Sequence, residues 1–152
     1  MTLSLEAGML KQIPMFREVE MAKLKLMALA SERLTYGPGE AMFHEGDVPD
    51  AVYVILAGAV EVLRNGPTGV VRIALLEAGA LVGELAVICD SRRSATIAAV
   101  SDVSALKIEK TTFLDLLAHS SQLSMAVTRE LAHRLEGMLA IFAKNQQAGS
   151  KA

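Results

Sequence analysis

The sequence contains no tryptophan, and aromatic residues make up only 4% of its 152 residues. We therefore expect no surface that stacks the bases of single-stranded nucleic acid. Positive charge is also scarce: the formal net charge is −2, whereas nucleic-acid binding normally requires a basic surface. The single cysteine, Cys89, excludes an internal disulfide framework, fits a reducing compartment, and is predicted to be a buried thiol.

Long hydrophobic runs are missing as well. The longest apolar or glycine run, Ala51–Val60, is far shorter than a membrane-spanning helix. The N-terminal residues lack the basic region and long apolar region that are typical of a secretory signal. These absences predict a cytoplasmic protein that has neither a membrane nor a nucleic acid as its partner.

The residues that are present, 52% hydrophobic and 21% charged, predict a single folded domain with an ordinary core. We place this domain at residues 1–144 and predict that residues 145–152, which are small and polar, form a flexible tail. Apolar residues recur at helical spacing across residues 5–31, where Pro14 can open a second helix after a break. This pattern predicts helices that pack one face on the rest of the domain.

Residues 33–109 follow a different pattern, in which short apolar or alternating runs are separated by glycine-containing turns. Such runs predict an antiparallel jelly-roll-like β-barrel, with the uniformly apolar segment Ala51–Leu56 as a central strand. Helical spacing returns at residues 111–144, as a short helix capped by Thr111 or Thr112 and a long C-terminal helix. The predicted fold class is α+β, mainly β, with helices at both ends of the barrel.

The stretch Gly83–Thr96, which reads GELAVICDSRRSAT, interrupts the strands and carries the candidate binding residues. Gly83 lets the backbone approach a ligand closely, and Glu84–Ile88 can form a short helix whose first amides face an anion. Arg93 offers a forked, permanently charged donor for phosphate oxygens, and an ionised Glu84 accepts hydrogen bonds from sugar hydroxyls. An acid and an arginine on either side of one turn predict binding of a nucleotide with a single exposed phosphate.

Other interpretations of these residues stay open. Glu84 at a helix start is often only a surface acid, and Arg93 can form a structural ion pair with Asp90 or Glu84. No serine, cysteine or acid lies in a recognisable catalytic motif, so the protein is predicted not to be an enzyme and to need no cofactor. The histidines are far apart and are interpreted as solvated surface residues that form no metal site: His44, His119 and His133.

Four apolar residues of the long C-terminal helix recur at intervals of four, three and four: Leu131, Leu135, Met138 and Phe142. This is the spacing of a coiled-coil seam. The helix therefore either packs on the barrel or pairs with the same helix of a second chain, and we favour the homodimer.

Three segments together resemble the cyclic nucleotide-binding domain family, the ligand-sensing module of catabolite-activator-type regulators, cyclic-nucleotide-dependent kinases and gated channels. The segment from Gly83–Ala86 to Arg93–Thr96 is similar to the family's phosphate-binding cassette. The other two match the family's early turns and central hairpin: Tyr36–Glu40 through Glu45–Asp47, and Asp50–Ile55 through Gly58–Val62. The resemblance covers roughly Leu10 to Ala143.

The resemblance implies that Glu84 binds the ribose 2′-hydroxyl and that Arg93 pairs with the cyclic phosphate. The whole implied ligand-binding set is Gly83, Glu84, Leu85, Ala86, Arg93, Ser94 and Ala95. A base cap on the long helix would be apolar here, formed by Met138 and Leu139. A hydroxyl at Ser94 does not decide between cyclic AMP and cyclic GMP, and we favour cyclic AMP.

The chain departs from the family pattern in two ways. Arg92 stands where proline is common, so we expect a looser turn and a second cation near the phosphate. Regulators of this family continue into a helix-turn-helix domain after the long helix, and since only a short segment stands after Lys144 here, we expect the sensor alone. We therefore predict a non-enzymatic cytoplasmic sensor that binds a cyclic mononucleotide and signals through its C-terminal helix to an unknown protein partner. The alternatives are a ligand-free interaction or assembly domain, and a fragment of a larger regulator or channel.

Overall fold

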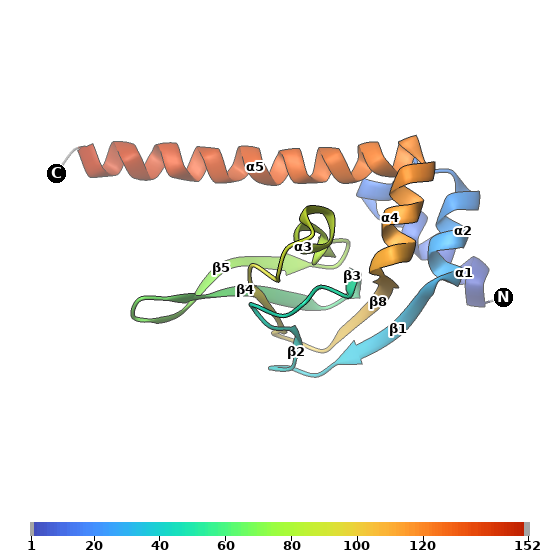
Figure 1. The fold of residues 1–152 in the computed structure, drawn as a ribbon, viewed down its shortest axis with the longest axis horizontal. Coiled ribbons are helices and arrows are strands. Elements are labelled where there is room, and N and C mark those ends of the chain that lie inside the picture. Colours follow the sequence, from blue (N-terminus) through green and yellow to red (C-terminus); the bar gives the residue numbers. More distant parts are fainter. Residues whose placement is uncertain (1, 151–152) are drawn as a thin grey trace.

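A computed structural model describes the backbone of residues 2–150 and the side chains of residues 5–146 (Figure 1). The chain begins with α1 (Thr2–Gln12), the 3₁₀ helix η1 (Pro14–Phe16) and α2 (Met21–Leu29). Pro14 occupies the start of η1, where its missing N–H costs no hydrogen bond. The predicted N-terminal helices are thus present, and Pro14 opens the second one.

In the part of the chain that the structure describes, eight strands form two four-stranded antiparallel sheets. They are β1 (Ser31–Tyr36), β2 (Ala41–Phe43), β3 (Ala51–Ala57), β4 (Ala59–Gly66), β5 (Gly69–Glu77), β6 (Leu81–Val82), β7 (Thr96–Ala99) and β8 (Val103–Glu109). The strand orders are β1-β8-β3-β6 and β2-β7-β4-β5. The predicted jelly-roll-like antiparallel fold is confirmed. Within the described residues, its strands pair in two separate sheets and not in one closed barrel.

The uniformly apolar strand β3 is buried on both faces, which explains its composition. Tyr53 and Ile55 face a cluster between the two sheets, whereas Val52 and Val54 face a second cluster under the helices. Successive side chains of a strand point to opposite faces, so a strand covered on both sides has no polar face. β3 lies between β8 and β6, which confirms the predicted central strand.

Three helices follow or interrupt the strands: α3 (Glu84–Cys89) between β6 and β7, then α4 (Lys110–His119) and α5 (Ser121–Ser150). The predicted cap of α4 by Thr111 or Thr112 is wrong. The helix begins directly where β8 ends, with Glu109 at the N-cap position and no side-chain cap, and the Lys110 amide donates to the Asp50 carbonyl at 2.9 Å. The chain therefore turns into the helix before either threonine is reached.

The helix α5 continues well past the predicted end at Lys144. Residues 145–150, predicted as a tail, are helical, and residues 151–152 lie outside the described part of the chain. In Figure 1 the helix extends beyond the rest of the molecule, above the β4–β5 hairpin. None of the helices in the described residues is both long and apolar enough to span a bilayer.

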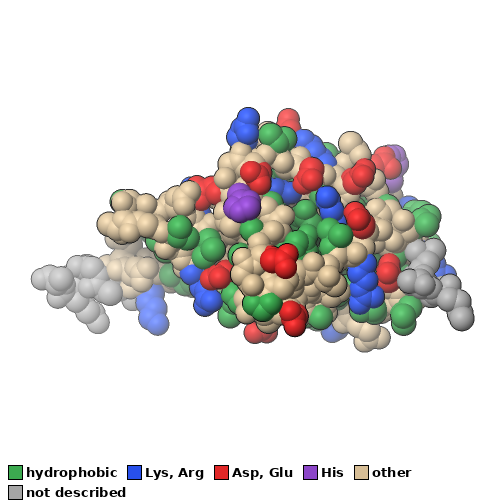
Figure 2. Space-filling view, turned by 90° about the horizontal axis from the view of Figure 1, so that it is seen from below, with side chains coloured by type: hydrophobic (Ala, Val, Ile, Leu, Met, Phe, Trp, Pro, Cys, Tyr) green, Lys and Arg blue, Asp and Glu red, His purple; other side chains and the backbone are tan. Residues whose placement is uncertain are grey.

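The two halves of α5 differ in packing. Leu123 and Val127 are buried against α4 and the N-terminal helices, whereas Leu135, Met138 and Phe142 are exposed. Packing on the domain therefore accounts for the first half of the helix only. On the face opposite α5, acidic and basic side chains are interspersed, and neither sign dominates the part that the structure describes (Figure 2).

Candidate functional site

A cavity of about 100 Å³ lies between α3, the β4–β5 hairpin and α5. The sequence-predicted ligand-binding residues all contribute to its wall: Gly83, Glu84, Leu85, Ala86, Arg93, Ser94 and Ala95. The other lining residues are mostly apolar: Phe43, Val62, Leu76, Val82, Ile97 and Arg134. The structure thus places residues from both ends of the stretch Gly83–Thr96, which were predicted to act together, in the wall of one cavity. The predicted base-cap residues, Met138 and Leu139, are exposed on α5 and do not line this cavity.

Arg93 is a buried cation with incomplete compensation. Its side chain is only 1% exposed, and its two terminal nitrogens donate to the carbonyl oxygens of Gly83 at 2.7 Å and Ala51 at 2.6 Å. The nearest carboxylate belongs to Asp50, at 3.5 Å, and that side chain is 65% exposed. The Nε atom has no hydrogen-bond partner. Burial lowers the pKa of Arg93 and the Asp50 carboxylate opposes this shift, but an arginine keeps its charge in proteins.

A buried polar group without a partner costs free energy, and a buried charge costs more. An anion in the cavity would supply both the missing acceptor and the missing negative charge. The ion-pair interpretation with Asp90 or Glu84 is wrong, because Asp90 bonds to Lys110 and Glu84 bonds to α5.

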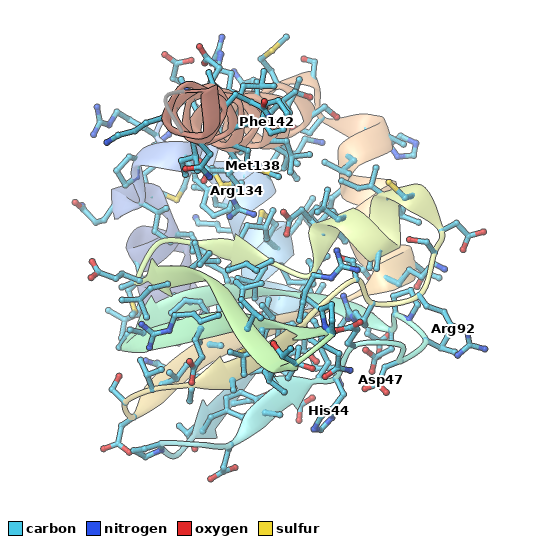
Figure 3. The ribbon with its side chains drawn as sticks, turned by 90° about the vertical axis from the view of Figure 1, so that its left-hand side faces the viewer. His44, Asp47, Arg92, Arg134, Met138 and Phe142 are labelled. Carbon is cyan, nitrogen blue, oxygen red and sulfur yellow. The ribbon has the colours of Figure 1, made fainter. Side chains whose placement is uncertain are left out.

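Glu84 is also buried, at 2% exposure, so the interpretation as a surface acid is wrong. Arg134 of α5 donates to its Oε1 atom at 2.6 Å and to the Leu81 carbonyl at 2.6 Å. Burial raises the pKa of Glu84 above its ordinary value, and the Arg134 charge opposes part of this rise. Figure 3 shows Arg134 extending from α5 toward the rest of the molecule.

Gly83 has a left-handed backbone, with φ +83°, at the N-cap of α3. A Cβ atom at this position would lie 2.6 Å from Nη1 of Arg93. The predicted close approach therefore exists, but the group that approaches the Gly83 backbone in this structure is the Arg93 guanidinium. Glycine is required here both by the conformation and by the space.

The turn before Arg93 is held by the segment that follows β2. The Gly46 amide donates to the Arg93 carbonyl, the Arg93 amide donates to the Asp47 carbonyl, each at 2.8 Å, and Arg92 donates to the Gly46 carbonyl at 3.1 Å. Arg92 therefore contributes a hydrogen bond to this turn, and the looser turn expected relative to proline stays a prediction. Arg92 is exposed, does not line the cavity, and lies with His44 and Asp47 on a side away from Arg134 (Figure 3).

Other sequence-predicted features have clear outcomes. The prediction of a buried Cys89 is wrong: the thiol is exposed because α3 turns Ala86 and Val87 inward and its last residue outward. The histidines His44, His119 and His133 are exposed, as predicted. No three His, Cys, Asp or Glu side chains gather within the described residues in a way that could hold a metal ion.

Six lining residues were not predicted from the sequence, and two of them contact the predicted Glu84 and Arg93: Arg134 and Phe43. Arg134 meets Glu84 across 50 residues of sequence, and no local pattern connects them. Phe43 lies in the three-residue strand β2, and nothing in the sequence around it distinguishes it from a residue of the hydrophobic core. The one sign of a role for Arg134 in the sequence was its charge, which stands next to the apolar residues of the long helix.

Comparison with known proteins agrees with this geometry. The family model described as Cyclic nucleotide-binding domain matches residues 33–120. Cyclic AMP receptor protein of Thermus thermophilus is 29% identical over 127 residues, which cover 83% of this chain and 59% of that protein. Lysophospholipase NTE1 of Chaetomium globosum is 28% identical over 111 residues, which cover 72% of this chain and 7% of that enzyme.

A solved structure gives the same result. The crystal structure of the Thermus thermophilus catabolite activator protein superimposes with a TM-score of 0.74 and 28% identity, over 84% of this chain and 61% of that one. The chain thus spans 7% of that lysophospholipase and about three fifths of the Thermus thermophilus proteins.

Proposed function

The chain belongs to the cyclic nucleotide-binding domain family, and we propose that it is a non-enzymatic sensor whose ligand, a cyclic mononucleotide, binds around Arg93. The observation that carries the proposal is the Arg93 guanidinium, 3% exposed, incompletely paired, and part of the cavity wall opposite an acid. A cyclic phosphate supplies the single negative charge that this site lacks. Glu84 accepts a hydrogen bond from the ribose 2′-hydroxyl, and the backbone at Ser94 and Ala95 adds contacts to the phosphate.

Cyclic AMP is the favoured ligand, because a relative that matches 83% of this chain is named a cyclic AMP receptor protein. The cavity of about 100 Å³ is smaller than the roughly 300–1,000 Å³ of typical small-molecule sites, so the ligand enters as the site widens. The ion pair between Arg134 and Glu84 links α5 to the cavity wall, and a ligand that contacts Glu84 changes this ion pair. The shift of α5 then brings Met138 and Leu139 over the base.

Signalling follows from the same shift. A ligand that binds the protein more tightly with α5 in one position than in another changes the populations of these two conformations. The difference between its affinities for the two conformations limits the size of this change. The face that α5 presents to a protein partner changes with it. We place the protein in the cytoplasm, in keeping with its single cysteine.

The exposed half of α5 supports a homodimer. Leu135, Met138 and Phe142 are each more than half exposed, and a helix segment without tertiary contacts is marginal in water. Their seam spacing suits the same helix of a second copy. Arg134 follows Leu131 by three residues and precedes Met138 by four, so at about 100° per residue it lies directly beside the seam on the surface of the helix. The ion pair with Glu84 and the seam of the homodimer therefore occupy adjoining faces of α5.

Titration calorimetry of the purified chain with cyclic AMP and, separately, cyclic GMP tests the proposal. We expect dissociation constants of micromolar or below, which is about −8 kcal/mol or better, and at least a tenfold weakening in Arg93→Ala. Arg33→Ala removes an arginine of β1 that does not line the cavity and is the matched control. Arg93→Lys keeps the charge in case the alanine variant does not fold.

Absence of heat and of a melting shift with both nucleotides at millimolar concentration would refute the sensor proposal. Equal affinity of Arg93→Ala and the original protein would refute the assigned phosphate site. The first result would leave an interaction or assembly domain as the working hypothesis, to be tested on α5, and the second would leave a nucleotide sensor with a different phosphate site.

A further inference from the structure

Arg93 lies against an aromatic ring. Its Cζ atom is 3.9 Å from the centroid of the Phe43 ring, well inside the distance of about 6 Å at which a cation and an aromatic face attract one another. Phe43 is 9% exposed and Arg93 is 3% exposed, so water screens this attraction little. Phe43 also lines the cavity.

The hydrogen bonds of Arg93 leave one rotation of the guanidinium open, and the Phe43 ring lies where it restricts that rotation. Nη1 and Nη2 are fixed by the carbonyls of Gly83 and Ala51. Two fixed atoms define an axis, and the planar guanidinium can still tilt about it. Nε, the third nitrogen, has no partner to stop this tilt. The face of Phe43 is the contact that sets the plane.

Resting on the proposed function, we propose that Phe43 is a positioning residue that holds the Arg93 guanidinium in the plane in which it receives the ligand's phosphate. In the ligand-free protein the electron-rich ring face compensates part of the charge that Asp50, at 3.5 Å and largely exposed, leaves uncompensated. When the phosphate arrives, the donor is already oriented and loses little freedom. The affinity therefore depends on the electronic character of the ring as well as on its shape.

The ring has a second neighbour, which defines the competing explanation. Phe43 lies 5.9 Å from the Tyr53 ring, at an interplanar angle of 31°, and belongs to the core between the sheets. A purely structural role would depend on the volume of the side chain and not on the charge of its face.

Fluorination separates the two roles, because each fluorine withdraws charge from the ring face and changes the shape little. The measurement is titration calorimetry with cyclic AMP on the full chain carrying phenylalanine, 4-fluoro-, 3,5-difluoro- or pentafluorophenylalanine at position 43. We expect the dissociation constant to rise at each step, by about tenfold over the series. The matched control is the same series at Phe113, a fully buried phenylalanine outside the cavity, where the dissociation constant stays constant.

A dissociation constant that does not change across the series at position 43 would overturn the proposal, whatever happens to stability. The ligand-free protein supplies a second measurement, the proton chemical shift of Arg93 Nε–H, which the ring current and ring charge displace. We expect this shift to follow the fluorine series. If it does while neither cyclic nucleotide binds, the proposed ligand is wrong and the positioning by Phe43 stands. If it does not, the ring does not hold the guanidinium.

Discussion

Glu84 and Arg134, 50 residues apart in the sequence, meet at 2.6 Å with the carboxylate buried and the guanidinium half-buried. The pair joins the start of α3 to the middle of α5. Glu84 is also the residue proposed to receive the ribose. Under the proposed function, occupation of the cavity and the position of α5 would be coupled through this one carboxylate.

The first prediction concerns the pH dependence of stability. Burial raises the pKa of Glu84 in the folded state, so the folded protein holds this proton more tightly than the unfolded chain. The contribution of Glu84 to stability is complete below the unfolded pKa and is lost as the pH rises through the folded pKa. Glu84→Gln removes this loss, so its free energy of unfolding relative to the original protein should increase from about pH 4 to pH 7. Urea unfolding at several pH values measures it.

Glu18→Gln is the control for this experiment, because it removes a carboxylate whose side chain is 81% exposed. Parallel stability curves for Glu84→Gln and the original protein would contradict the prediction.

The second prediction concerns Gly83→Ala. The new Cβ atom would combine an unfavourable φ of +83° with a 2.6 Å approach to Arg93 Nη1. We expect a loss of about 1–3 kcal/mol in stability and at least a tenfold loss of cyclic nucleotide affinity, since the guanidinium is displaced. Gly137→Ala on α5 is the matched control: nothing lies within 4 Å, and it should add up to about 1 kcal/mol. Thermal melts and calorimetry measure both variants, and normal binding by Gly83→Ala would argue against the site.

The third prediction separates backbone strain from steric clash. Gly39 and Gly58 have nearly equal φ values, +87° and +89°. A Cβ atom at Gly39 has no neighbour within 4 Å, whereas at Gly58 it would lie 2.1 Å from the Asp102 carbonyl oxygen. We expect Gly39→Ala to cost about 1–2 kcal/mol and Gly58→Ala to cost more than about 4 kcal/mol or to prevent folding. Chemical unfolding decides, and equal losses would show that the contact at Gly58 is relieved by the backbone.

The fourth prediction concerns self-association through α5. Leu135→Asp places a charge in the proposed seam and should weaken the homodimer at least tenfold, as measured by sedimentation equilibrium. Ala140→Asp makes the same change of charge on the opposite side of the same helix and should leave the dimer intact. A monomeric original protein, or equal effects of the two variants, would exclude this seam.

The sequence predicted what depends on short spacing. Gly83, Glu84 and Arg93 lie within one stretch, so their chemistry could be interpreted together, and the alternation of strand residues revealed the sheets. It did not predict Arg134 or Phe43, because their contacts with Glu84 and Arg93 arise only when distant elements pack. Periodicity reports that a helix or strand exists, and not which of its side chains will meet a buried charge.

The errors have similar physical causes. Thr111 and Thr112 are good capping residues, but the chain enters α4 earlier, because the Lys110 amide is already bonded to Asp50. Cys89 was predicted to be buried because free cysteines usually are, but the orientation of the six-residue helix α3 leaves its side chain exposed. The small polar residues after Lys144 carry no strong helix stop, and α5 continues through them.

The dimensions of α5 give the Glu84–Arg134 pair a mechanical consequence. At 1.5 Å per residue, the 30 residues of the helix form a rod about 45 Å long. Its buried residues, Leu123 to Val127, act as the fulcrum, and the far end lies roughly two to three times as far from them as Arg134 does. If α5 moves as a rigid rod, a displacement of about one ångström at Arg134, where the helix contacts Glu84, thus becomes roughly two to three ångströms at the end of the helix. Under the proposed function, a small rearrangement inside the cavity would therefore produce a larger displacement at the end of α5 that a partner could contact.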